Sequence, residues 1–105
     1  MSNVTVEYDI LREAVITKKQ IKCLYKGHIR YVCPHTIGYK NSREKVLTFQ
    51  FSGGSSSGLP PQGEWRCMFI EELSQIEILD GEWHTGANHS RPQTCVDDVD
   101  VEVKF

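Results

Sequence analysis

Residues 21–33, IKCLYKGHIRYVC, decide the fold class of this chain. Ile21, Cys23 and Tyr25 alternate with Lys22, Leu24 and Lys26, and Ile29, Tyr31 and Cys33 then alternate with Arg30 and Val32. Two short alternating runs around a glycine are typical of antiparallel strands joined by a tight turn. The stretch therefore predicts a β-hairpin around Gly27. The second strand should lose its hydrogen bonding, or bulge, at Pro34, which has no backbone N–H to donate.

Further strands are expected on both sides of an uncharged segment at 52–63. That segment contains GGSSSG followed by LPP, a composition typical of a flexible loop that divides the sheet and not the domain. Apolar alternation predicts strands at 46–51, at 65–70 and up to Asp80-Gly81, with a polar turn at 40–43. A C-terminal strand is predicted at 97–105, where valines alternate with acidic residues.

A single helix should precede these strands, between about Thr5 and Lys18. Its apolar residues recur at helical spacing, at Tyr8, Leu11, Ala14 and Val15. A helix this short is marginal in water, so its apolar stripe must pack on the sheet. We therefore expect one domain over 1–105 of the mostly β (α+β) class. An N-terminal helix would pack on a strongly curled antiparallel SH3-like or Sm-like small barrel of five to six strands, because closure limits open edges.

Charge is unevenly distributed along these 105 residues, whose net charge is −2. Residues 18–45 hold eight Lys/Arg against one Glu, and residues 64–105 hold ten Asp/Glu against three Lys/Arg. The basic half is a candidate face for an anionic ligand, although the two halves could equally complement each other within the molecule. No apolar run is long enough to cross a bilayer, and residues 1–7 lack the pattern of a secretory signal, so we expect a cytoplasmic protein without a membrane partner.

The four cysteines lie in separate segments without CxxC spacing, and in the cytoplasm they would be reduced core thiols. One alternative is a Zn site built from Cys33 and His35 with His84 or His89, but one intervening residue is unusual spacing for such a site. Another is a Cys/His-dependent enzyme using Cys33 or Cys95, although no nucleophile motif surrounds either residue. The Gly-rich loop lacks the spacing of a nucleoside triphosphate-binding loop. We predict no enzyme activity, metal or cofactor.

The order of residues over about 8–80 resembles the WYL domain family of bacterial regulators. The matching positions are Ala14, Tyr25, Arg30, Val32, Pro34, Ile37, Leu47 and Arg66, and residues 66–73 stand where the family has an R-x-F-R-L-D-R-I type run. The resemblance implies a helix followed by an SH3-like or Sm-like sheet, in a free-standing member without a DNA-binding partner domain. The chain departs from the pattern at Lys45, Val46, Phe69 and Glu72, which weakens the anionic-ligand inference.

The resemblance also implies a ligand site on a basic, aromatic-lined sheet face. Arg30 and Arg66 match arginines of the pattern and could bind a phosphate, while Tyr25 or His35 could stack or hydrogen-bond. The alternative is that Tyr25 belongs to the core and that Arg66 pairs with a neighbouring acidic residue, Glu64 or Glu71.

The preferred function is a non-catalytic regulatory or ligand-sensing module for nucleic acid or a nucleotide-like anion. A structural protein is the second hypothesis. In that case the C-terminal strand would pair with another copy or with a partner protein by strand addition.

Overall fold

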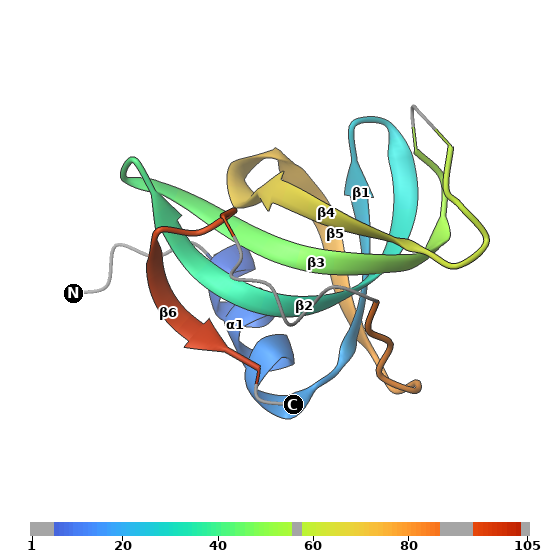
Figure 1. Cartoon of the computed structure of the whole chain (residues 1–105), viewed down its shortest axis with the longest axis horizontal. Coiled ribbons are helices and arrows are strands. Elements are labelled where there is room, and N and C mark those ends of the chain that lie inside the picture. Colours follow the sequence, from blue (N-terminus) through green and yellow to red (C-terminus); the bar gives the residue numbers. More distant parts are fainter. Residues whose placement is uncertain (1–5, 56–57, 87–93, 104–105) are drawn as a thin grey trace.

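The structure is a computed structural model that describes residues 6–55, 58–86 and 94–103. The elements follow in this order: α1 (Val6–Thr17), β1 (Gln20–Tyr25), β2 (His28–Lys40), β3 (Arg43–Gly53), β4 (Glu64–Phe69), a 3-10 turn η1 (Ile70–Glu72), β5 (Leu73–Leu79) and β6 (Asp98–Glu102). Figure 1 shows α1 against one face of a single curved sheet, with β6 beside the second half of β2. The expected mostly β class with one leading helix is confirmed.

Helix α1 buries the four residues that its spacing predicted, Tyr8, Leu11, Ala14 and Val15. The helix ends where Lys18 adopts a left-handed backbone with φ of 53°. The amide of Lys19 then donates to the carbonyl of Ala14 at 3.0 Å, which satisfies one of the last helical carbonyls. This ending turns the chain directly into β1.

The predicted hairpin around Gly27 is confirmed, with Tyr25 opposite His28. Lys26 and Gly27 both have positive φ, 50° and 80°, as the preferred two-residue hairpin turn requires. A second hairpin of the same kind joins β2 to β3, where Asn41 and Ser42 have φ of 52° and 66°. This is the polar turn predicted at 40–43.

Strand β2 organises the sheet because it has neighbours along both edges. β3 lies along one edge, and β1 and β6 follow each other along the other, giving the order β4-β3-β2-β1-β5 with β6 paired to β2. β2 runs through Pro34, and its register against β3 shifts between Pro34 and Thr36. The strand therefore bulges at Pro34, as one of the two expectations had it, and its hydrogen bonding does not end there.

The sheet is open. β4 and β5 are the end strands of the order, and the ladders between the described residues do not join them, so the expected closed small barrel is not what this architecture shows. η1 connects the two strands across the gap. The predicted C-terminal strand is present at 98–102 and pairs within the same sheet, while residues 104 and 105 lie outside the described part.

The core lies between α1 and the sheet. It comprises Tyr8, Leu11, Ala14, Val15, Ile21, Cys23, Tyr25, Val32, Ile37, Val46, Met68, Ile70, Leu73 and Val103. None of the helical segments in the described ranges is both long and apolar enough to span a bilayer.

The prediction that all four cysteines are reduced is wrong for two of them. Cys67 and Cys95 form a disulfide with a Cα–Cα distance of 5.6 Å, whereas Cys23 and Cys33 are free and buried. The bonded pair lies 28 residues apart in the chain, and only the return of residues 94–97 across the sheet brings them together. Sequence spacing gives no sign of such a contact.

Candidate anion-binding site

Arg30 lies on the face of the sheet that α1 covers, opposite Cys23 of β1, and is only 3% exposed. Its Nε donates to the carbonyl oxygen of Tyr25 at 3.3 Å, and its Nη1 donates to Oε1 of Gln50 at 3.4 Å. The guanidinium carbon also lies 4.9 Å from the centre of the Tyr25 ring. Both acceptors are neutral, so these two bonds hold the guanidinium without neutralising its charge.

Arg66 projects from β4 on the same face. It pairs with Thr48 of β3, and Thr48 and Gln50 share one face because they are two residues apart. Its Nη2 donates to Oγ of Ser55 at 3.1 Å and to the carbonyl of Gly58 at 3.3 Å, and it forms an ion pair with Glu64 at 3.0 Å. Its Nε is buried and has no hydrogen-bond partner among the described residues.

The two arginines are close enough to affect each other's ionisation. Burial lowers the pKa of Arg30, and the positive charge of Arg66 lowers it further. An arginine remains protonated at neutral pH despite such shifts. The site therefore contains two positively charged groups on one face of the sheet, with Glu64 as the carboxylate bound to Arg66.

The Tyr25 ring packs against Arg30 and is not exposed for stacking with a ligand. It is 6% exposed and belongs to the core, as the alternative interpretation of this residue expected. Arg30 lies against its ring, and Lys26 lies 5.3 Å from the ring centre. Burial raises the pKa of the Tyr25 phenol, and the charge of Glu72, whose Oε1 lies 3.4 Å from the hydroxyl, raises it further. The phenol is therefore neutral and positions Arg30.

His35 lies on the opposite face, away from the other three predicted site residues. The centre of its ring lies 4.7 Å from the centre of the Trp65 ring. Trp65 and Arg66 are neighbours on β4, so their side chains point to opposite faces of the sheet. The two ring nitrogens of His35 bond the carbonyl of Cys33 at 2.7 Å and Oγ1 of Thr85 at 3.0 Å. At 2% exposure, His35 is buried on this outer face.

Aromatic side chains surround His35 on that outer face. The ring centres of Trp83 and His35 lie 4.4 Å apart, and those of Phe49 and Trp65 lie 5.3 Å apart. His84 stacks on Phe51 at 4.2 Å. Residues 83–85, which follow β5, thus cover the part of the sheet that Cys33 and His35 occupy.

Gln50 belongs to the arginine site but was not predicted from the sequence. A signal for Gln50 was present, because it is a polar residue within the apolar strand at 46–51 and alternation places it on the buried face with Val46. A buried amide of this kind needs a polar partner, which here is Arg30. Glu64 was one of the two acidic partners that the sequence offered for Arg66, and the structure shows this ion pair.

The geometry gives the metal and thiol alternatives no support. The described residues contain no cluster of three or more His, Cys, Asp or Glu side chains that could hold a metal ion, and His89 lies outside them. Burial raises the pKa of the Cys33 thiol, which disfavours the nucleophilic thiolate. The sulfur of Cys33 instead accepts a hydrogen bond from the backbone amide of His84 at 3.2 Å. Cys95 is the disulfide partner of Cys67.

Comparison with known proteins adds no relative to these observations. No protein family, no curated protein and no solved structure matches the chain.

Proposed function

We propose that this protein is a non-catalytic ligand-binding module whose ligand presents a phosphate or similar oxyanion to Arg30 and Arg66. The observation that carries the proposal is the placement of two guanidinium groups on one sheet face, where neutral acceptors hold Arg30 and one acidic residue is bound to Arg66. The foremost candidates are a nucleotide-like anion and a nucleic acid strand.

Arg66 is the group that a ligand would meet first. Its side chain is 18% exposed, and the carboxylate of Glu64 beside it is 45% exposed. Ion pairs with such an exposed partner contribute little, about 1 kcal/mol or less, so a phosphate can compete for this guanidinium. The Nε of Arg66, which is buried and has no hydrogen-bond partner among the described residues, belongs to the planar fork with which an arginine binds two oxygens of one phosphate. Arg30, already ordered by Gln50, would add charge without further loss of side-chain freedom.

The departures from the WYL pattern mostly lie away from this site. Lys45 and Phe69 face each other across β3 and β4, with the ammonium 4.4 Å from the ring centre, on the face opposite Arg66. Val46 is buried in the core. Glu72 alone is close, through its contact with Tyr25, and brings a negative charge to the margin of the site. The partial resemblance therefore supports a ligand-sensing role, and a cytoplasmic location remains part of that proposal.

A titration at low salt tests the proposal. Fluorescently labelled single-stranded oligonucleotides and nucleoside triphosphates are added to the protein, and the affinity is measured by anisotropy or calorimetry. Losing a charged hydrogen bond of about 1.5–3 kcal/mol predicts that Arg66→Gln weakens binding about 10- to 100-fold. The matched control is Arg12→Gln, since Arg12 lies on α1 in an exposed ion pair with Asp100. No binding of either probe class to the wild-type protein at low salt contradicts the proposal.

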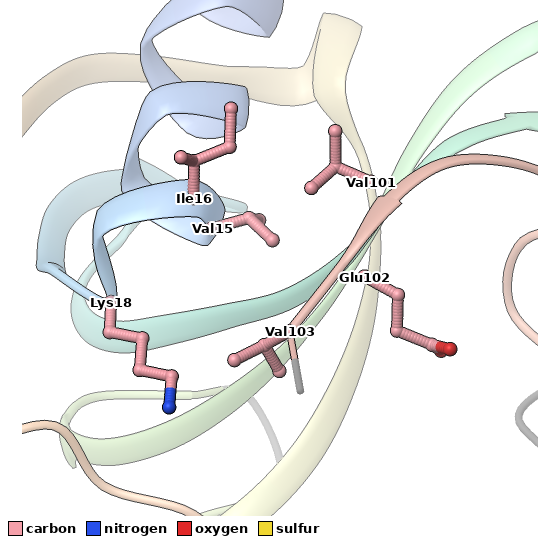
Figure 2. A pocket seen from close by; sticks show the side chains of 6 residues that line it. All are labelled: Val15, Ile16, Lys18, Val101, Glu102 and Val103. Atoms are coloured by element: carbon pink, nitrogen blue, oxygen red, sulfur yellow. The ribbon is translucent and has the colours of Figure 1, made fainter. Parts of the chain in front are cut away.

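A second candidate function is association through β6, and one surface feature favours it. β6 pairs with β2 along one edge, and no other strand of the described chain adjoins it. Val99 on β6 is 47% exposed, and Ile16 of α1 is 51% exposed. A groove of about 330 Å³ lies between these two elements. Figure 2 shows the side chains that line it, which are Val15, Ile16, Lys18, Val101, Glu102 and Val103.

Light scattering as a function of concentration tests this second candidate. Association through β6 predicts a dimer that Val99→Glu converts to a monomer, because a like charge would be added next to the acidic residues of the strand. A wild-type protein that stays monomeric at all concentrations contradicts self-association through β6.

A further inference from the structure

The disulfide between Cys67 and Cys95 joins strand β4 to the irregular segment that precedes β6. Cys67 is an exposed residue on β4, and Cys95 is buried in the segment 94–97, which we call the strap because it leads back across the sheet into β6. Their Cα–Cα distance of 5.6 Å lies within the range that a disulfide needs. The bond therefore needs no movement of the backbone.

Hydrogen bonds hold the strap to β2. Nζ of Lys40 donates to the carbonyl of Thr94 at 2.8 Å, and the amide of Asp97 donates to the carbonyl of Tyr39 at 3.0 Å. Val96 is buried between them and lies over Gly38. These contacts can keep the strap and β6 in place when the disulfide is open.

β4 depends more on the disulfide than the strap does. As an end strand it has β3 as its neighbour, and no strand of the described chain pairs with its other edge. Cys67 faces Leu47 of β3 in the ladder, so the covalent bond attaches the middle of β4 to the strap. Opening the bond would therefore loosen β4 while the remainder of the sheet stays paired.

We propose that Cys67 and Cys95 form a reversible redox modification site, which exchanges with small thiols and disulfides and fixes or frees β4. Exposed disulfides are generally the ones that exchange, and in the cytoplasm, where we expect this protein, disulfides are usually transient or redox-sensing. The buried thiols Cys23 and Cys33 take no part, because burial raises the pKa of both, that of Cys23 to about 11.

The exchange proceeds in two balanced steps. The thiolate of a small reductant such as glutathione attacks the sulfur of Cys67, which breaks the Cys67–Cys95 bond and releases Cys95 as a thiolate that takes up a proton. A second glutathione thiolate attacks the mixed disulfide, releasing Cys67 as a thiolate and leaving glutathione disulfide. Two electrons pass to the protein, and the reverse reaction returns them to glutathione disulfide.

Alkylation with mass spectrometry, in glutathione buffers of graded redox poise, tests this site on the intact chain. The site predicts two alkylated cysteines, Cys23 and Cys33, after denaturation of the oxidised protein and four after denaturation of the reduced protein, with a reversible transition between them. Amide hydrogen exchange on the same samples should show rates in β4 about tenfold or more higher after reduction, with β1 and β2 unchanged.

Two variants control the experiment. In Cys67→Ser/Cys95→Ser the exchange in β4 should not respond to redox poise, whereas Cys23→Ser/Cys33→Ser should respond like the wild-type protein. Four free thiols in glutathione disulfide buffer overturn the proposal. A bond that excess reduced glutathione leaves intact in the native protein, or equal β4 exchange in both redox states, also overturns it.

Discussion

Reducing the Cys67–Cys95 disulfide should lower the free energy of unfolding by a predictable amount. The bond closes a loop with a sequence separation of 28 residues. The chain-entropy relation for a loop of that size gives a loss of about 12 cal/mol/K of unfolded-state entropy, or about 3.6 kcal/mol at 25 °C. A domain of this length has a total stability of about 5–15 kcal/mol, so the effect is large enough to measure reliably.

Urea unfolding of the oxidised and the reduced wild-type protein measures this difference without any substitution. With an m-value of about 1–3 kcal/mol/M, the midpoint should fall by about 1.2–3.6 M on reduction. The m-value should also rise, because the unfolded chain without the cross-link exposes more surface. Cys67→Ser/Cys95→Ser is the control, since adding reductant should leave its midpoint unchanged. A difference below about 1 kcal/mol between the two wild-type samples refutes the reasoning, because the cross-link would then constrain the unfolded chain far less than its loop length requires.

Three further predictions concern the fold. Gly38→Ala should cost about 1–3 kcal/mol in thermal unfolding, because its Cβ would meet the β6 backbone, and an unchanged melting temperature would show that β6 is not seated on β2 in this way. Gly27→Ala should cost only about 1–2 kcal/mol, because nothing lies within 4 Å of its Cβ and the cost comes solely from a φ of 80°; a larger loss than at Gly38 would reverse the expected order. The hydrogen bond from Tyr8 is the main cause of the lowered pKa of Asp100, so the stabilisation is present above the ordinary carboxyl pKa near 3.8 and is lost as pH falls through the lower folded value. Tyr8→Phe should therefore reduce the acid dependence of stability by about 0.2–1 kcal/mol, given the partial exposure of the carboxylate, and an acid dependence identical to that of the wild-type protein would contradict this.

Much of the fold was predictable because it is encoded locally. The 3.6-residue spacing of α1, the alternation of each strand and the glycine of the first hairpin all depend on neighbours within a few residues. The open sheet and the disulfide were not predictable in this way. Whether β4 reaches β5, and whether Cys67 meets Cys95, depends on contacts between distant segments that no local pattern records.

The candidate site was predicted only in part, because local alternation along a strand determines the face on which a residue lies but not which distant residues it contacts. Arg30 and Arg66 lie on one face because each strand alternates regularly through them. His35 is five residues from Arg30, an odd separation that places it on the other face even before the bulge at Pro34 is considered. The contribution of Gln50 could have been inferred from its polarity within an apolar strand, and the ion pair of Arg66 with Glu64 was one of the two pairings that the sequence offered.

The most direct test of the central claim is the NMR signal of each arginine Nε–H during titration with an oligonucleotide or a nucleoside triphosphate. The account predicts that the Arg66 signal, assigned with Arg66→Lys, shifts with the largest amplitude because its Nε has no hydrogen-bond partner in the described structure. The Arg30 signal should shift with it, and the signal of Arg12 on α1 should not. Binding that leaves Arg30 and Arg66 unmoved, or that shifts Arg12 equally, would contradict an anion site between the two arginines.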